Sequence, residues 1–304
     1  MKMDKRTRLA EVFRDTQVFY QTDPVLTAAV EASKRDTRLY DAGKAPVFSE
    51  NPQKIGRIAV TKSRIFEAAM RLAKRYPGKK VAVLNFASAT KPGGGVINGS
   101  SAQEESLCRC STLYPTLDTR FLWQHYYDVN RTLADVLHTD ACIYSPGIVI
   151  CKTDTDFPER LPQAQWVTVD VISCAAPNLR NQPTNQYNPE GGEAVTILPE
   201  QLMQLHEKRA RAILQVAVAN QVDILVLGAF GCGAFRNDPR VVAQAYTNVL
   251  KECRSYFDLV EFAIYCREFE TENYDAFNEN LGAIRFGKLS DEVDWGEPHG
   301  SEVW

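Results

Sequence analysis

Short apolar segments alternate with amphipathic ones along most of this 304-residue chain, and this alternation restricts the possible folds more than any other feature. The amphipathic segments predict helices over residues 63–75, 200–220 and 239–253. The apolar segments predict strands over residues 55–60, 80–86, 147–151, 166–173, 222–227 and 259–265. Strands that alternate with helices form a largely parallel sheet with helices on both faces. We therefore expect an α/β protein.

The two ends of the chain lie outside this alternation. Residues 6–20 predict a helix, and a second one runs from Pro24, with Asp23 as its N-cap, to about residue 38. Residues 41–52 are polar and contain glycine and proline, as in a connector, and the stretch after about residue 288 is polar and acidic, as in a tail. We predict an N-terminal helical extension (1–52), a main domain (53–287) and a C-terminal tail (288–304).

The charge and the metal-binding residue types exclude several classes of partner. With 35 basic and 38 acidic residues, the chain has no positive excess for duplex nucleic acid or an anionic membrane. Its eight cysteines show no C-x-x-C spacing and its four histidines no H-x-x-x-H spacing, so we expect no metal centre and no cofactor. The chain start resembles no signal segment, and no apolar run is long enough to cross a bilayer. We expect a cytoplasmic, soluble protein.

Two glycine-rich segments follow predicted strands. The first, residues 85–99, contains Gly93, Gly94 and Gly95 in succession; the second, residues 228–238, has the order G-x-x-G-x-G and ends at the predicted N-cap Asp238. Glycine leaves backbone N–H groups unshielded, and in parallel α/β sheets ligands bind at the carboxyl ends of the strands. The segments therefore predict a backbone cradle for a diphosphate, aided by the following helix N-terminus. A turn without a ligand is an equal alternative for the second segment taken alone.

An acidic pair comes shortly after the first glycine segment. Gln103, Glu104 and Glu105 follow Gly95 after seven intervening residues, at the start of a predicted helix. Ser101 and Glu104 also fit a capping box, and that pattern alone favours capping, but the glycines upstream favour a site. Neighbouring helical residues diverge by about 100°, so the two glutamates should differ in role: one caps or holds a sugar hydroxyl, and the other faces the reacting bond. A carboxyl covered by ligand has a raised pKa, which suits a general acid.

Aromatic residues flank both segments. Phe86, Phe230, Phe235 and Tyr265 most simply pack in the core or cover it. We expect ligand contact for Phe235, which lies inside the second glycine segment, and for Tyr265 at the end of the last strand.

Three segments, in this order, resemble the microbial-type poly(ADP-ribose) glycohydrolases, which are catalytic members of the macrodomain superfamily. They are NFASATKPGGGVINGSSAQEESLCRCSTLY (85–114), VDVISCAAPNL (169–179) and VLGAFGCGAFRNDP (226–239). The resemblance extends over most of residues 6–286. It implies a three-layer α/β/α fold around a mixed, largely parallel sheet. It also implies hydrolysis of the ribose–ribose O-glycosidic bond of poly(ADP-ribose).

The resemblance also assigns roles to residues. It implies that Glu105 is the catalytic acid and that Glu104 positions ribose hydroxyls. The residues that it implies for ADP-ribose binding are Gly93, Gly94, Gly95, Val96, Gln103, Gly231, Cys232, Gly233, Ala234, Phe235, Asn237 and Tyr265.

The implied partner is poly(ADP-ribose) or an ADP-ribosylated protein, trimmed from chain termini by a monomer to release ADP-ribose. Three alternatives stay open: a macrodomain that binds ADP-ribose without cleaving it, a hydrolase of another ADP-ribosyl linkage, and a structural α/β protein. Gln103-Glu104-Glu105 favours the enzyme, because binding alone needs no acid. Residues 178–192 predict a long surface loop that lines the cleft or covers the sheet edge.

Overall fold

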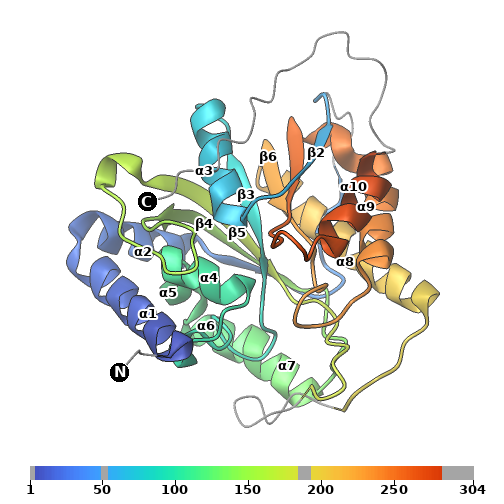
Figure 1. The fold of residues 1–304 in the computed structure, drawn as a ribbon, viewed down its shortest axis with the longest axis horizontal. Coiled ribbons are helices and arrows are strands. Elements are labelled where there is room, and N and C mark those ends of the chain that lie inside the picture. Colours follow the sequence, from blue (N-terminus) through green and yellow to red (C-terminus); the bar gives the residue numbers. More distant parts are fainter. Residues whose placement is uncertain (1–3, 49–53, 184–192, 283–304) are drawn as a thin grey trace.

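The computed structural model describes residues 4–48, 54–183 and 193–282. A seven-stranded sheet has the order β1-β4-β5-β3-β6-β7-β2 (Figure 1). Pairs that involve β4 are antiparallel, and all other pairs are parallel. The predicted α/β class with a mixed, largely parallel sheet is thereby confirmed. The strands are β1 (Arg38–Tyr40), β2 (Arg57–Thr61), β3 (Val81–Phe86), β4 (Cys142–Ile150), β5 (Val167–Cys174), β6 (Ile224–Leu227) and β7 (Leu259–Ala263).

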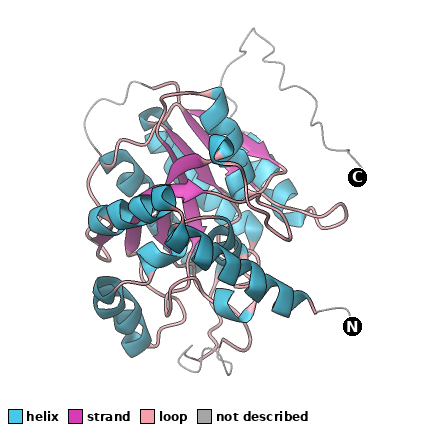
Figure 2. Cartoon of the chain, turned by 90° about the vertical axis from the view of Figure 1, so that its left-hand side faces the viewer, coloured by secondary structure: helices cyan, strands magenta, loops and turns pink. Residues whose placement is uncertain are grey.

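Helices cover both faces of the sheet (Figures 1 and 2). The reason is that successive side chains of β3 point to opposite faces of the sheet. Ala82 and Leu84 pack in the core with the helices over residues 199–219 and 239–253, whereas Val81 and Val83 pack with the helices over residues 65–75 and 113–117. The helices are α1 (Lys5–Thr22), α2 (Pro24–Asp36), α3 (Ile65–Arg75), α4 (Gln103–Cys110), α5 (Leu113–Leu117), α6 (Arg120–Leu122), α7 (Asp128–Leu133), α8 (Pro199–Ala219), α9 (Pro239–Cys253) and α10 (Glu272–Gly282). None of the helices that the structure describes combines the length and the apolar character of a membrane span.

The structure contains both predicted N-terminal helices, and they pack beside the sheet. Asp23 accepts hydrogen bonds from the N–H groups of Val25 and Leu26 and so starts α2. Phe13 of α1 is buried in the core with residues of α3 and α5. The carbonyl of Arg6 lies where a Cβ on Gly99 would stand, so α1 closes directly onto the loop that precedes α4.

Two parts of the sheet differ from the expected strands. β4 begins at Cys142, upstream of the predicted start, and its register shifts between Ser145 and Ile148. β1 is an unpredicted edge strand of three residues within the first 52, and it pairs with β4. Three residues are too few to show the alternation that identifies a strand. The strand forms because it pairs with β4, which lies far along the chain. The domain division stays a prediction, and the tail and residues 184–192 of the predicted surface loop lie outside the described residues.

Candidate active site

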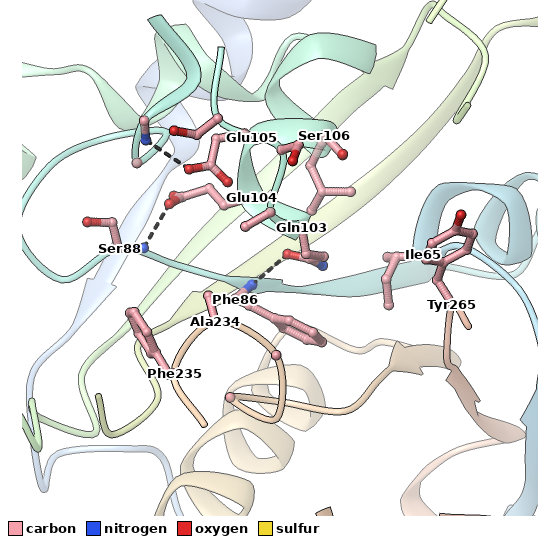
Figure 3. A pocket seen from close by; sticks show the side chains of 18 of the residues that line it. Ile65, Phe86, Ser88, Gln103, Glu104, Glu105, Ser106, Ala234, Phe235 and Tyr265 are labelled. Atoms are coloured by element: carbon pink, nitrogen blue, oxygen red, sulfur yellow. Dashed lines mark hydrogen bonds between the residues drawn. The ribbon is translucent and has the colours of Figure 1, made fainter. Parts of the chain in front are cut away.

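A cavity of about 980 Å³ lies at the carboxyl ends of the parallel strands. The segments that follow β2, β3, β5, β6 and β7 form its walls, and α1 and α4 close it on one side. Figure 3 shows Phe235 and Ser88 at one end and Tyr265 with Ile65 at the other. This is the position expected for a ligand site in an open α/β sheet, with a volume at the upper end of small-molecule pockets.

The first glycine loop (residues 91–99) needs glycine for two different contacts. Gly93 and Gly94 have φ values of 65° and 54°, in the left-handed region. A Cβ on Gly93 would stand 2.7 Å from the ring of Tyr114, so Gly93 lets the loop pack on α5. A Cβ on Gly94 would stand 2.7 Å from Oε1 of Glu105. The backbone at Gly94 therefore lies directly against the predicted catalytic carboxyl.

Glu105 is hydrogen-bonded to this loop. The N–H of Gly95 donates a hydrogen bond of 2.9 Å to its Oε1. One helical turn later, buried Arg109 donates to the carbonyl of Ser100 at 2.6 Å, while its Nε has no hydrogen-bond partner in the described chain. Burial lowers the pKa of Arg109, and the negative charge of Glu105 partly offsets this. The buried guanidinium of Arg109 thus interacts electrostatically with the Glu105 carboxyl, from the next turn of α4.

Glu104 points to a different part of the same wall. Its Oε2 accepts a hydrogen bond of 2.8 Å from the N–H of Ser88, and its Oε1 accepts one of 3.3 Å from Nδ2 of Asn85 (Figure 3). Burial, followed by the negative charge of Glu105, raises the pKa of Glu104 to about 8. Burial of Glu104 therefore favours its protonated form at neutral pH.

The capping-box alternative is wrong. The N-cap residue of α4 is Ala102, no side chain caps the helix, and the carboxyl of Glu104 turns toward β3 instead. The first turn of α4 is tied to β3 by Gln103, whose Oε1 accepts from the N–H of Phe86 at 2.9 Å and whose Nε2 donates to the carbonyl of Leu84 at 2.8 Å. Gln103 thus holds α4 in the position that presents both glutamates.

The second glycine loop (residues 228–238) is held from behind by one amide. Nδ2 of buried Asn237 donates to the carbonyls of Pro177, Gly231 and Phe235 at 2.7, 3.0 and 3.3 Å. Oδ1 of Asn237 lies 2.8 Å from Nε2 of His206, behind the loop. Asp238 caps α9, as predicted, by accepting from the N–H of Arg240. The backbone of the loop is left facing the cavity, beside a helix N-terminus.

The structure brings most of the predicted site residues together. Those that line the cavity are Gly94, Gly95, Gln103, Glu104, Glu105, Gly231, Gly233, Ala234, Phe235 and Tyr265. Gly93, Val96, Cys232 and Asn237 are not among the lining residues: Gly93 contacts Tyr114, and Val96 is fully buried in the core. Contact of these predicted residues with ADP-ribose stays a prediction.

The two aromatic ends differ in their neighbours. The Arg64 guanidinium lies 4.0 Å from the centre of the Tyr265 ring and also pairs with Asp156, so one face of this half-exposed ring is covered. The Phe235 ring lies 6.1 Å from that of His138 and 5.5 Å from the Arg180 guanidinium. Arg64 and His138 were not expected from the sequence, because each stands in a segment without a motif. Arg180 belongs to the predicted surface loop over 178–192, of which Asn178 and Arg180 line the cavity.

The titratable residues do not form a metal centre within the described ranges. No group of three or more His, Cys, Asp or Glu side chains there could hold a metal ion.

Comparisons with known proteins agree with this geometry. Residues 15–153 match the family model of the microbial-type PARG catalytic domain. The structure is similar to poly(ADP-ribose) glycohydrolase from Thermomonospora curvata bound to the inhibitor ADP-HPD, with 31% identity, a TM-score of 0.75, and 90% of this chain and 99% of that chain covered. It is also similar to the enzyme from Deinococcus radiodurans in complex with ADP-ribose, with 34% identity, a TM-score of 0.68, and 84% and 97% covered. No curated protein sequence shows a significant match.

Proposed function

This chain belongs to the microbial-type poly(ADP-ribose) glycohydrolase family and hydrolyses poly(ADP-ribose), and we propose that it does so at chain termini with Glu105 as the general acid. One observation carries the assignment of the acid. The Glu105 carboxyl lies in the cavity, fixed on the N–H of Gly95 beside the protonated carboxyl of Glu104. A group that donates a proton must be held within reach of the reacting bond, and this contact holds it.

Charge supports one orientation of the terminal ADP-ribose. The backbone N–H groups of the second glycine loop and the N-terminus of α9 would attract a diphosphate, whereas the two carboxyls beside the first loop offer it no positive charge. The diphosphate therefore lies on residues 231–235, and the distal ribose lies between Phe235 and the two glutamates. The adenine then extends toward Tyr265 at the other end of the cavity (Figure 3).

The chemistry follows from this placement. Protonated Glu105 donates to the departing 2′ oxygen of the neighbouring ribose, and positive charge develops on C1″ and the ring oxygen. The resulting carboxylate then activates the water that attacks C1″ and recovers the proton. Substrate that covers Glu105 also excludes bulk water from the reacting bond. Neutral Glu104 can donate to a ribose hydroxyl without adding a second negative charge to the pair.

The experiment is a time course with purified poly(ADP-ribose) of uniform length. Cleavage from termini releases free ADP-ribose from the first time point while the chains shorten by single units. Early fragments of intermediate length would contradict terminal cleavage. Binding without any release would contradict the enzymatic function itself. Release from a mono-ADP-ribosyl ester but not from the polymer would favour the alternative linkage.

We also propose a monomer as the active form. The walls of the cavity described above come from a single chain, so no second subunit is needed to complete them. The rate per milligram of protein should stay constant over a thousandfold dilution. A rate that falls on dilution would contradict this.

A further inference from the structure

Arg180 is held rigidly at the rim of the cavity. Its Nε donates to Oδ1 of Asn178 at 2.9 Å, and a second guanidinium nitrogen donates to the carbonyl of Pro183 at 3.0 Å. Arg180 and Asn178 both line the cavity, and the guanidinium lies 5.5 Å from the centre of the Phe235 ring. Two hydrogen bonds from one planar group fix its orientation, which is the arrangement that suits bidentate recognition of a phosphate.

The charge of Arg180 has no counterion in the described part of the chain. Burial lowers the pKa of this half-buried guanidinium, and no acidic neighbour raises it. By contrast, Arg160 pairs with Asp15 at 2.6 Å and Arg211 pairs with Glu252 at 2.7 Å. Partial burial of a cation is costly unless an anion compensates it. The anion that fits here is one that arrives with the substrate.

A second polar group faces the same place. His138 lines the cavity next to Phe235, and its Nδ1 is buried without a hydrogen-bond partner in the described chain. Burial, followed by the charge of Arg209, lowers the pKa of His138 to about 4, so the ring is neutral at physiological pH. His138 therefore adds a neutral, polar ring to this end of the cavity, next to Arg180 and Phe235.

The position of Arg180 and His138 in the cavity indicates which part of the substrate they contact. Phe235 and Ser88 mark the end of the cavity opposite Tyr265, and Glu104 lies next to Ser88 (Figure 3). In the orientation proposed above, the diphosphate of the terminal unit lies between this end and Tyr265. The unit that leaves carries its own diphosphate, on the 5′ oxygen of the ribose whose 2′ oxygen departs. That second diphosphate must pass the end of the cavity where Arg180 stands.

Resting on the proposed function, we propose that Arg180, with His138 beside it, forms a subsite for the diphosphate of the leaving unit, on the far side of the bond that is cut. The subsite favours an anionic polymer over an ADP-ribosyl group whose leaving group carries no phosphate. It contributes to substrate binding and takes no part in the bond cleavage.

The test compares two substrates in Arg180→Gln, Arg180→Lys and the control Arg236→Gln. Arg236 is an exposed arginine next to Phe235 that does not line the cavity. One substrate is poly(ADP-ribose); the other is ADP-ribose joined at C1″ to p-nitrophenol, whose leaving group has no phosphate. For Arg180→Gln we expect KM for the polymer to rise about tenfold with kcat nearly constant. KM for the p-nitrophenyl substrate and the affinity for ADP-ribose should change less than about twofold, and Arg180→Lys should be intermediate because it keeps the charge without the planar fork.

The dependence of the polymer KM on KCl concentration gives a second, independent test of the proposal. Raising KCl should increase the polymer KM of the wild type more steeply than that of Arg180→Gln, because screening weakens the same contact. An equal loss on both substrates would overturn the proposal and place Arg180 in the site of the terminal unit. An unchanged polymer KM in Arg180→Gln, or an equal rise in Arg236→Gln, would also overturn it. If the wild type cleaves neither substrate, the proposed function fails instead.

Discussion

The two glycine loops of the cavity are built alike but held differently. Both follow a central parallel strand and both place backbone N–H groups near the cavity. The first is held by the Glu105 carboxyl, which itself lies in the cavity, whereas the second is held by the amide of Asn237, which lies behind the loop. In the first loop, therefore, one group both orders the backbone and is available to react. In the second loop, the group that orders the backbone is separate from the surface offered to the ligand.

The two loops also have different electrostatic surroundings. The first loop lies against two carboxyls, and the second lies beside the N-terminus of α9. In the orientation proposed above, the anionic diphosphate of the ligand lies on the second loop and its neutral sugar lies beside the first. Changes in the first loop should thus act on turnover, and changes in the second on affinity.

The largest effect is expected for Glu105→Gln. The amide can still accept the hydrogen bond from the N–H of Gly95, so the loop stays ordered, but it cannot donate a proton as an acid. We expect kcat to fall about a thousandfold or more, with ADP-ribose affinity changed less than about threefold. Single-turnover kinetics and calorimetry measure the two quantities.

Glu105→Ala is the matched variant, because it removes the hydrogen bond to the loop as well as the acid. It should lose ADP-ribose affinity in addition to turnover. Equal losses of affinity in both variants would mean that Glu105 serves only to bind.

The next effect concerns pH. Glu104 keeps its proton up to about pH 8 in the folded protein but loses it near pH 4.5 in the unfolded chain. Its contribution to stability is therefore present below pH 4.5 and is lost as pH rises toward 8. Glu104→Gln cannot lose a proton, so its free energy of unfolding should exceed that of the wild type by about 5 kcal/mol at pH 9 and by little at pH 4.5.

Urea unfolding at several pH values measures this difference. The loop held by Asn237 has a neutral amide and should impose no such dependence. A difference between wild type and Glu104→Gln that is constant with pH would show that Glu104 is ionised in the folded protein at neutral pH.

A smaller effect is expected for Gly94→Ala. The added Cβ would stand 2.7 Å from Oε1 of Glu105 and must displace it. A shift of this kind at a reacting group costs about a hundredfold in kcat/KM. The control is Gly78→Ala, since Gly78 also has positive φ (82°) but no atom within 4 Å of the added Cβ.

Both variants should lose about 1 kcal/mol of stability from the left-handed backbone, and only Gly94→Ala should lose activity. Kinetics together with thermal unfolding separate the two effects. Activity at the wild-type level in Gly94→Ala would contradict the contact between this loop and the acid.

The smallest effect on function is expected for Asn237→Ala. It leaves the carbonyls of Pro177, Gly231 and Phe235 without the donor that gathers them. We expect the Kd for ADP-ribose to rise about tenfold, while kcat falls less than about threefold because the first loop still holds Glu105. Asn248→Ala on α9, which removes a hydrogen bond to Glu207, is the control. A fall in kcat as large as the rise in Kd would mean that the two loops are not independent.

The sequence predicted the framework well because the framework has local causes. The strand over 80–86 and the helix over 239–253 were located from periodicity and caps and lie where expected. The glycine loops were located because closely spaced glycines directly follow two predicted strands. β1 was missed because a three-residue edge strand depends entirely on its partner β4.

The site was predicted in part, for a similar reason. Glu104, Glu105 and Phe235 stand in recognisable motifs and line the cavity. Arg64 and His138 come from segments without a motif, and only folding places them next to Tyr265 or Phe235. Arg180 follows directly on the segment 169–179, but its position beside Phe235 also depends on the fold. No local rule reports a contact between residues about 200 positions apart, as Arg64 and Tyr265 are.

What the amino-acid sequence determined by itself is the set of groups and their order: two acids on one helical turn, preceded by three glycines and followed later by a second glycine loop. Steric freedom and helical period are properties of neighbouring residues, so they can be read without the fold. Only the tertiary structure decided which backbone N–H each carboxyl accepts, and which of the two has the raised pKa. The physical reason is that burial and Coulomb energies depend on atoms brought together from β3, the first glycine loop and α4, and not on their order along the chain.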